Sequence, residues 1–142
     1  MARLSDVLGV PVMADESANS IQSVMEIVKR KAASIIDIKL AKMGGIYNAR
    51  KVAAIADAAG LPLYAGGQVA TSIGAATAAH FYTATSNVIG GDFQLGPDGW
   101  LAADIVKKPL QVKGGLAEVP VDGPGIGVEL DEEKLEKLAV RR

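Results

Sequence analysis

Short apolar runs alternate with longer amphipathic stretches along most of this chain. Short runs of apolar residues predict buried strands, and stretches in which apolar residues recur about every 3.6 positions predict helices. The predicted strands cover residues 10–14, 34–40, 61–65 and 87–90. The predicted helices cover residues 1–8, 21–28, 46–59 and 70–82. Strand and helix therefore alternate with a repeat of about 25 residues, which is typical of consecutive βα units.

Four consecutive βα units fit two α/β architectures that the hydrophobic pattern does not distinguish. One is a flavodoxin-like open sheet, and the other is half of a (β/α)₈ barrel. Both bury parallel strands beneath helices, which agrees with an aromatic content of only 4%.

The pattern changes in the last quarter of the chain. Two short runs on either side of Gly114–Gly115 predict a β-hairpin. The charged stretch that follows predicts a short helix with Asp131 as its cap. We therefore expect residues 1–107 to hold four βα units and residues 108–142 to form a hairpin and helix that return to pack on another part of the protein.

Composition excludes several classes of protein. A length of 142 residues suits one domain, and 49% hydrophobic with 22% charged residues excludes a disordered chain. The chain has no cysteine, so disulfides, thiolate metal sites and thiol nucleophiles are excluded. A formal net charge of −1 predicts no nucleic-acid partner. No apolar run is long enough for a membrane span and the N-terminus does not resemble a secretory signal, so we expect a cytoplasmic protein.

Side-chain alternation selects two charged residues at neighbouring strand ends. In the second predicted strand, Ile36 and Ile38 share the face that helices cover, and Asp37 and Lys39 share the other. In the first predicted strand, Asp15 can point to the same side as Lys39. Active sites of α/β proteins form at the carboxyl ends of parallel strands, so this carboxylate and this ammonium could serve one site. A solvated strand end or a surface ion pair remains the alternative.

Around these residues the chain resembles a known family. The strings MADES (residues 13–17) and KLAKMGG (residues 39–45) are similar to the fifth and sixth barrel strands of the enolase superfamily. Within this superfamily the chain is similar to the muconate cycloisomerase/mandelate racemase-like enzymes, and most of all to the muconate cycloisomerase (muconate-lactonising) subgroup. The string GPGIGVELD (residues 123–131) resembles the end of that subgroup. The resemblance implies the C-terminal half of a (β/α)₈ barrel, about strands 5–8.

The resemblance also implies a chemistry and the residues that perform it. Asp15, with Glu16 as a second candidate, would bind Mg²⁺ or Mn²⁺, hard cations that prefer oxygen ligands. Glu16 alternatively acts as a helper or a helix-start carboxylate. Lys39 would act as general acid/base or stabilise an enolate after α-proton abstraction from a small carboxylate substrate. In this subgroup the reaction is the reversible closure of cis,cis-muconate to a muconolactone, a step of aromatic catabolism.

Further site residues follow from the seventh and eighth strands of the family. Gly66 and Gly67 would leave room for substrate. Asp92 is a catalytic candidate and Gln94 a substrate-binding candidate, because the family carries a carboxylate before a Gly-Pro pair. Here Gly96–Pro97 follows Asp92 with a register shifted by one residue.

Four other residues have structural interpretations. A backbone anion nest formed by Gly66, Gly67 and Gln68 with Ser72 is less favoured than a tight βα turn. His80 lies inside a predicted helix and is expected to pack there. Trp100 is expected to anchor packing, and Lys42 to be a solvated loop lysine.

This sequence has no counterparts of the family's first four barrel strands, of two of its metal-binding carboxylates or of its capping domain. We therefore expect a C-terminal fragment of a cycloisomerase that is inactive alone and forms a homo-oligomer or self-associates. Dipeptide epimerases, N-succinylamino acid racemases and o-succinylbenzoate synthases share the same Asp and Lys and remain alternatives. A non-catalytic half-barrel is another. A flavodoxin-like phosphate binder is disfavoured because the acidic Asp15–Ser17 turn would repel phosphate.

Overall fold

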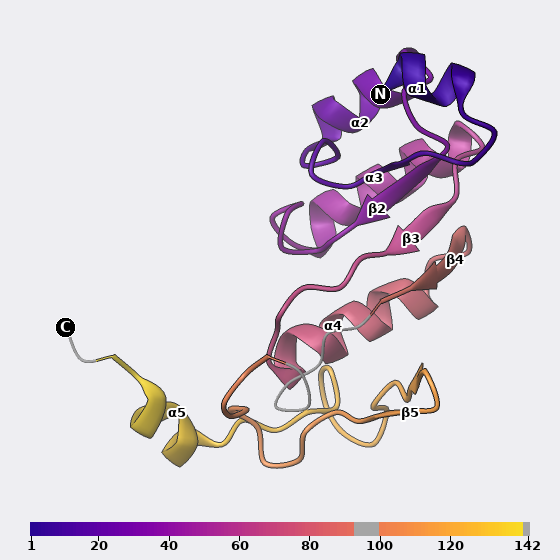
Figure 1. The fold of residues 1–142 in the computed structure, drawn as a ribbon. Helices are drawn as coiled ribbons and strands as arrows, with labels where there is room; N and C mark the ends of the chain where they lie inside the picture. Colours follow the sequence, from indigo (N-terminus) through magenta and orange to yellow (C-terminus); the bar gives the residue numbers. More distant parts are fainter. Residues whose placement is uncertain (93–99, 141–142) are drawn as a thin grey trace. The chain divides into compact units, whose positions relative to one another are not determined.

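The described residues of the chain form two compact units. The computed structural model describes residues 1–92 and 100–140 (Figure 1). The N-terminal unit comprises residues 1–67 and 85–92. The C-terminal unit comprises residues 68–84 and the described part of the chain after residue 92. The helix after the third strand thus groups with the C-terminal segment, whereas the sequence pattern places it among the βα units of residues 1–107.

A parallel sheet forms the centre of the N-terminal unit. Its strands are β1 (Met13–Ala14), β2 (Ile35–Ile38), β3 (Leu63–Ala65) and β4 (Val88–Gly91), paired in the order β1-β2-β3-β4. The helices of this unit are α1 (Ala2–Val7), α2 (Ile21–Lys29) and α3 (Ile46–Ala58). A flavodoxin-like sheet places its second strand outside the first, so the sequential order excludes that architecture for the described sheet. Sequential order is the order of neighbouring barrel strands.

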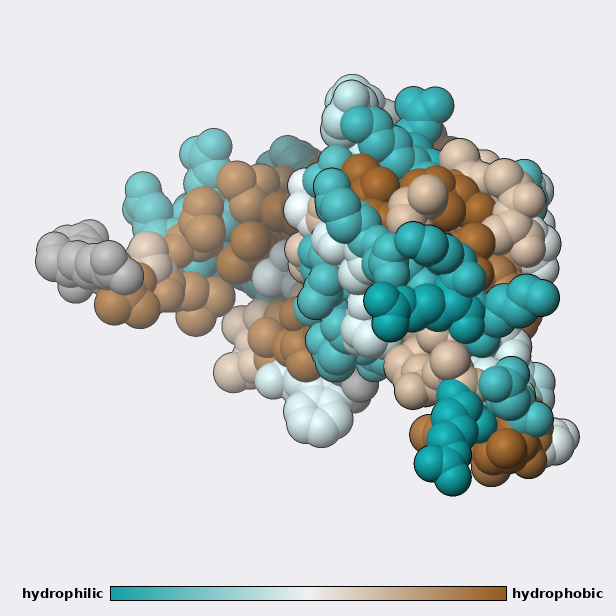
Figure 2. All heavy atoms as spheres, turned by 90° about the horizontal axis from the view of Figure 1, so that it is seen from above, coloured by the Kyte–Doolittle hydropathy of each residue, from teal (hydrophilic) through white to brown (hydrophobic). Residues whose placement is uncertain are grey.

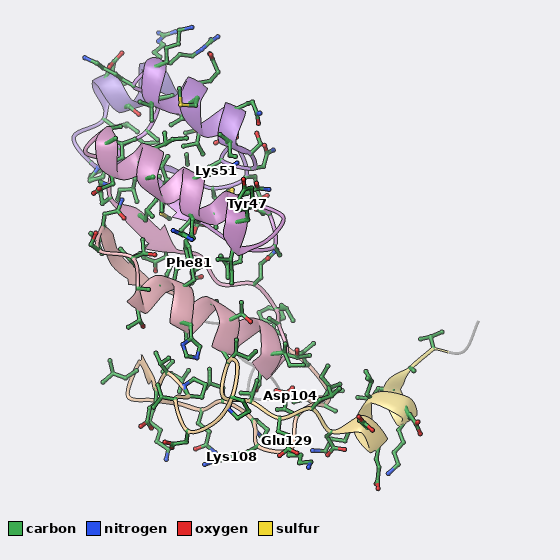
Figure 3. The ribbon with its side chains drawn as sticks, turned by 180° about the vertical axis from the view of Figure 1, so that it is seen from behind. Tyr47, Lys51, Phe81, Asp104, Lys108 and Glu129 are labelled. Atoms are coloured by element: carbon green, nitrogen blue, oxygen red, sulfur yellow. The ribbon has the colours of Figure 1, made fainter. Side chains whose placement is uncertain are left out.

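Helix boundaries in this unit follow from local sequence. Ser20 caps α2, because its side chain accepts a hydrogen bond from the Ser23 backbone while the Ser23 side chain accepts one from the Ser20 backbone. The glycine that follows α3, Gly60, has a φ of +67°, which is a common way to end a helix. Helices α2 and α3 pack together, and Figure 3 shows both on the same side of the sheet.

The core of this unit lies between the sheet and these helices. The fully buried side chains include Ile36, Ile38 and Leu63 on the strands, and Val24 and Val52 on the helices. The even-numbered side chains of β2 therefore face the helices, as the alternation predicts. Because successive side chains of a strand point to opposite faces, Asp37 and Lys39 belong to the other face.

Apolar side chains also remain at the surface. Figure 2 shows hydrophobic and hydrophilic residues side by side on the viewed face. In the N-terminal unit the exposed apolar residues include Leu4, Val7 and Leu8 around α1 and Val10 just before β1. Among the described residues, no helix has the length and apolar character that crossing a bilayer requires.

The C-terminal unit consists of two helices and a hairpin. It contains α4 (Ser72–Thr83), β5 (Val112–Lys113), β6 (Leu116–Ala117) and α5 (Glu132–Leu138). Strands β5 and β6 pair in antiparallel register across Gly114 and Gly115, whose φ angles of +57° and +79° fit a tight hairpin turn. Asp131 caps α5 by accepting a hydrogen bond of 3.1 Å from the Lys134 backbone, so the predicted cap is observed.

Candidate functional site

Five charged side chains meet at the carboxyl ends of β1 and β2. We call Asp15, Glu16, Asp37, Lys39 and Lys42 the strand-end cluster; all belong to the N-terminal unit. The register of the two strands explains why they meet. Met13 pairs with Ile35 and Ala14 with Ile36, so the next positions along, Asp15 and Asp37, lie side by side.

An ion pair between Lys39 and Asp15 forms the centre of the cluster. The Lys39 Nζ donates hydrogen bonds of 2.7 Å and 2.9 Å to the two carboxylate oxygens of Asp15. Only 14% of the Lys39 side chain is exposed, so this contact is shielded from solvent on most sides. The prediction that Asp15 and Lys39 project toward each other from neighbouring strand ends is confirmed. Their chemical roles stay a prediction.

Lys42 is a second ammonium on the same carboxylate. Its Nζ donates a hydrogen bond of 2.5 Å to Asp15 Oδ1 and one of 2.7 Å to the Asp15 carbonyl oxygen. Its side chain is 9% exposed. The prediction of a solvated loop lysine is therefore wrong. The Met43 amide donates to the Lys39 carbonyl at 3.2 Å, so a helical turn follows β2 and returns Lys42 toward β1. The spacing Lys-x-x-Lys was the only sequence signal for this contact.

Asp37 lies deepest in the cluster. Its side chain is 5% exposed, and its Oδ2 lies 3.2 Å from Lys39 Nζ. Its Oδ1 is buried and has no hydrogen-bond partner among the described residues. Sequence alternation places Asp37 on the correct face but does not identify it as a site residue, because its burial depends on the neighbouring strand.

Gly66 explains how Asp37 and Lys39 fit together. A Cβ at this position would lie 2.0 Å from Asp37 Oδ1 and 2.7 Å from Lys39 Cγ. Neither distance is compatible with normal van der Waals contact. Gly66 therefore leaves room for two side chains of the cluster, whereas the sequence suggests room for substrate; a contact of Gly66 with substrate stays a prediction.

Burial and mutual charge shift the pKa values within the cluster. Burial raises the pKa of Asp37 to about 6, and the neighbouring Asp15 contributes in the same direction against the opposing effect of Lys39. For Asp15, burial alone would raise the pKa, but hydrogen bonds from Lys39 and Lys42 outweigh it and hold the pKa well below its usual value. For Lys39, burial would lower the pKa, but the contacts with Asp15 and Asp37 raise it above its ordinary value. Lys39 is therefore an ammonium in this arrangement.

The remaining predicted site residues lie at the edge of the cluster or outside it. Glu16 is 80% exposed, and its carboxylate approaches Lys39 Nζ only to 3.7 Å. Asp92 follows β4, and its Oδ1 accepts a hydrogen bond of 2.9 Å from the Gly67 backbone, so two predicted site residues contact each other. Gln94 lies outside the described residues.

The donor set bears on the predicted metal site. Carboxylate oxygens of Asp15 suit Mg²⁺ or Mn²⁺ by chemistry. Within residues 1–92 and 100–140, however, no three carboxylates or histidines gather as a metal site would require. Both Asp15 oxygens are also in contact with ammonium groups. The described residues therefore do not assemble a complete metal site by themselves.

Candidates in the C-terminal unit have structural partners. The backbone amide and hydroxyl of Ser72 both donate to the buried carboxylate of Asp104, the hydroxyl at 2.6 Å. The chain thus supplies its own anion at the start of α4. His80 Nε2 lies 3.0 Å from the Pro120 carbonyl, which supports the expected packing role. The side chain of Trp100 is exposed, so the prediction of a packing anchor is wrong.

Comparisons with known proteins agree on one family. The family model described as enolase C-terminal domain-like matches residues 1–134. A chloromuconate cycloisomerase from Cupriavidus necator is 38% identical over 136 residues, covering 95% of this chain and 36% of that protein. A muconate cycloisomerase from Acinetobacter lwoffii is 37% identical over 138 residues, covering 97% of this chain and 36% of that protein.

Solved structures give the same result. A 2-chloromuconate cycloisomerase from Rhodococcus opacus superposes with a TM-score of 0.89 at 37% identity, covering 99% of this chain and 37% of that one. A muconate lactonizing enzyme from Pseudomonas putida superposes with a TM-score of 0.84 at 34% identity, covering 98% and 38%. The chain thus spans about 36% of the length of these curated relatives.

Proposed function

Because this chain belongs to the enolase C-terminal domain-like family, we propose that it is the acid/base half of a muconate or chloromuconate cycloisomerase. In this proposal β1 to β4 are strands 5–8 of a (β/α)₈ barrel, and the rest of the barrel comes from residues outside this chain. The substrate is a small carboxylate. The observation that carries the proposal is the ion pair of the largely buried Lys39 with Asp15, at strand ends where α/β active sites form.

Lys39 is the residue we propose as the proton donor. In lactone closure, a carboxylate oxygen adds to a carbon–carbon double bond, and the displaced electron pair forms the enolate of the second carboxylate. The ammonium then delivers a proton to the α-carbon of that enolate. In the reverse direction the amine takes the α-proton back. The raised pKa keeps Lys39 protonated, so its positive charge is present to stabilise the enolate, although the ammonium is a weaker acid than that of an ordinary lysine.

Asp15 is the residue we propose as a ligand of a divalent cation. Such a cation, when bound, supplies positive charge at the substrate carboxylate. Asp15 offers oxygen atoms of the correct type, and Glu16 is exposed near it. The other ligands would come from outside the described residues, so we expect the 142-residue chain alone to show little or no turnover with Mn²⁺ and cis,cis-muconate.

A chimeric enzyme tests the proposal. The corresponding segment of the chloromuconate cycloisomerase from Cupriavidus necator would be replaced by this chain, and lactone formation measured with Mn²⁺ and cis,cis-muconate. We expect the chimera to be active, and Lys39→Met to lower its kcat by roughly 10²- to 10⁴-fold, the usual contribution of a general acid or base.

The control for the chimera is Lys29→Met, which removes an exposed lysine of α2. It should leave kcat unchanged. A folded chimera that retains full activity after Lys39→Met would contradict the proposed role. A folded chimera without any activity would instead favour a non-catalytic half-barrel.

A further inference from the structure

One buried carboxylate in the strand-end cluster has no part in the proposed chemistry. Asp37 is 5% exposed, so a substrate cannot reach it without rearrangement. Its Oδ2 nevertheless lies 3.2 Å from the Nζ of Lys39. We propose that Asp37 is a positioning residue that, together with Asp15, fixes the Lys39 ammonium at the carboxyl end of β2.

The geometry of β2 supports this role. Asp37 and Lys39 are two positions apart on one strand, so their side chains leave the same face. Lys39 has a long, flexible side chain whose ammonium has no fixed direction of its own. Asp15 contacts it from β1 at 2.7 Å, and Asp37 contacts it from β2 itself. Two anchors on different strands restrict the ammonium more than either carboxylate alone.

Lys42 provides a comparison within the same cluster. It also donates to Asp15, at 2.5 Å, but among the described residues it forms no ion pair with Asp37. Loss of Asp37 should therefore change the mobility of Lys39 and leave that of Lys42. A general structural effect of the substitution would change both lysines.

The end of the third strand leaves space for the contact between Asp37 and Lys39. Gly66, directly after β3, lies so close that a Cβ there would be 2.0 Å from Asp37 Oδ1. It would also be 2.7 Å from Lys39 Cγ. A side chain at position 66 would thus displace the pair from its present position. The absence of a side chain at this strand end is part of the positioning device.

This inference is tested without substrate, so its result is independent of the proposed reaction. The full 142-residue chain would be labelled with ¹⁵N-lysine, and the order of each side-chain ammonium measured by NMR relaxation. Lys39→Met assigns the Lys39 signal. We expect the wild-type Lys39 ammonium to be ordered, and Asp37→Asn to reduce its order measurably toward that of the exposed Lys29 without reaching it, because both hydrogen bonds to Asp15 remain.

The matched control is Asp57→Asn, the same substitution at an exposed position of α3. Melting curves followed by circular dichroism establish that both variants fold. In Asp37→Asn the order of Lys42 should be retained. If a folded Asp37→Asn chain keeps Lys39 as ordered as the wild type does, or loses order equally at Lys39 and Lys42, the positioning role is wrong.

A second variant perturbs the contact between Asp37 and Lys39 by a substitution at the end of β3. Gly66→Ala keeps the Asp37 carboxylate but places a Cβ where it collides with that carboxylate. We expect Lys39 to lose order in this variant too. Gly9→Ala is its control, because a Cβ at position 9 has no heavy atom within 4 Å. Should Asp37→Asn fail to fold, an unchanged Lys39 signal in Gly66→Ala would overturn the proposal.

Discussion

Two aspartates of this chain differ in the kind of hydrogen-bond donor that surrounds their carboxylates. Asp104, in the C-terminal unit, is 4% exposed and accepts from the Ser72 amide, the Ser72 hydroxyl and the Ile105 amide. Asp15, in the N-terminal unit, has a side chain that is 43% exposed and contacts the ammonium groups of Lys39 and Lys42. The first carboxylate is enclosed by neutral donors, and the second is partly exposed and is shared by two ammonium groups.

The difference separates a structural carboxylate from one available for chemistry. Neutral backbone and hydroxyl donors at the start of α4 have no alternative partner once they are buried, so Asp104 stabilises the fold. Ammonium groups on long side chains can change partner, and an exposed carboxylate can be reached by ligands. The strand-end cluster also contains Asp37, whose Oδ1 lacks a hydrogen-bond partner among the described residues, so this region is not optimised for stability alone.

The largest effect is expected where the structural carboxylate is removed. Asp104→Ala leaves the buried amide and hydroxyl of Ser72 and the part-buried amide of Ile105 without this acceptor. Each buried donor without a partner is costly, so we expect the free energy of unfolding to fall by on the order of 3–5 kcal/mol. Urea denaturation measures the fall, and hydrogen exchange of residues 72–84 locates it.

Asp57→Ala is the control for this substitution, because it removes an exposed carboxylate from α3. It should change the free energy of unfolding by less than about 0.5 kcal/mol, as is usual for surface positions. A loss below about 1 kcal/mol for Asp104→Ala would mean that its hydrogen bonds are replaced by water, and the contrast between the two aspartates would disappear.

A smaller effect, dependent on pH, is expected from the strand-end cluster. Folding raises the pKa of Asp37 from 3.8 to about 6, so its contribution to stability is fully present below pH 3.8 and is lost as pH rises through 6. Asparagine does not titrate. Relative to the wild type, Asp37→Asn should therefore gain on the order of 2–3 kcal/mol of unfolding free energy between pH 4 and pH 7.

Urea denaturation of both chains at several pH values checks this difference. The groups that face Asp37 are Asp15 and Lys39. Asp15, whose pKa is lowered, contributes stability above pH 3.8 that is lost only as pH falls further, so it stays ionised over the measured range. Lys39 stays protonated throughout. A difference between the two chains that does not vary with pH would show that Asp37 is not destabilised by ionisation.

Sequence predicts most of this fold because its signals are local. Periodicity identifies the strands and helices, and alternation along β2 places Asp37 and Lys39 on one face. The contacts that sequence misses are non-local. Lys42 reaches Asp15 only through the turn after β2, and Asp37 fits in its present position only because residue 66 of another segment has no side chain. No pattern within a single strand contains that information.

The cap on α4 shows the same limit. Ser72 starts this helix, and the sequence offers a site for an external anion there only as the less favoured alternative to a tight turn. The anion is Asp104, 32 residues later in the chain. Only the folded structure shows that the donors are already used.

The smallest effect is expected at another side chain of the C-terminal unit whose hydrogen-bond donor already has partners. His80 Nε2 lies 3.0 Å from the Pro120 carbonyl and 3.3 Å from the Ile126 carbonyl. Because carbonyl oxygens only accept, Nε2 must carry the hydrogen. His80→Leu keeps an apolar body but loses this donor, so we expect a loss of about 1 kcal/mol in unfolding free energy.

Hydrogen exchange around residues 120–127 measures the effect of His80→Leu where it should be concentrated. His80→Gln is the control, because its amide can still donate to a carbonyl, and it should lose less stability than His80→Leu. The order of the Lys39 ammonium should be identical in both variants and in the wild type. A change at Lys39 would contradict the comparison, because it would mean that a donor serving only the fold in one unit also governs the charged cluster in the other.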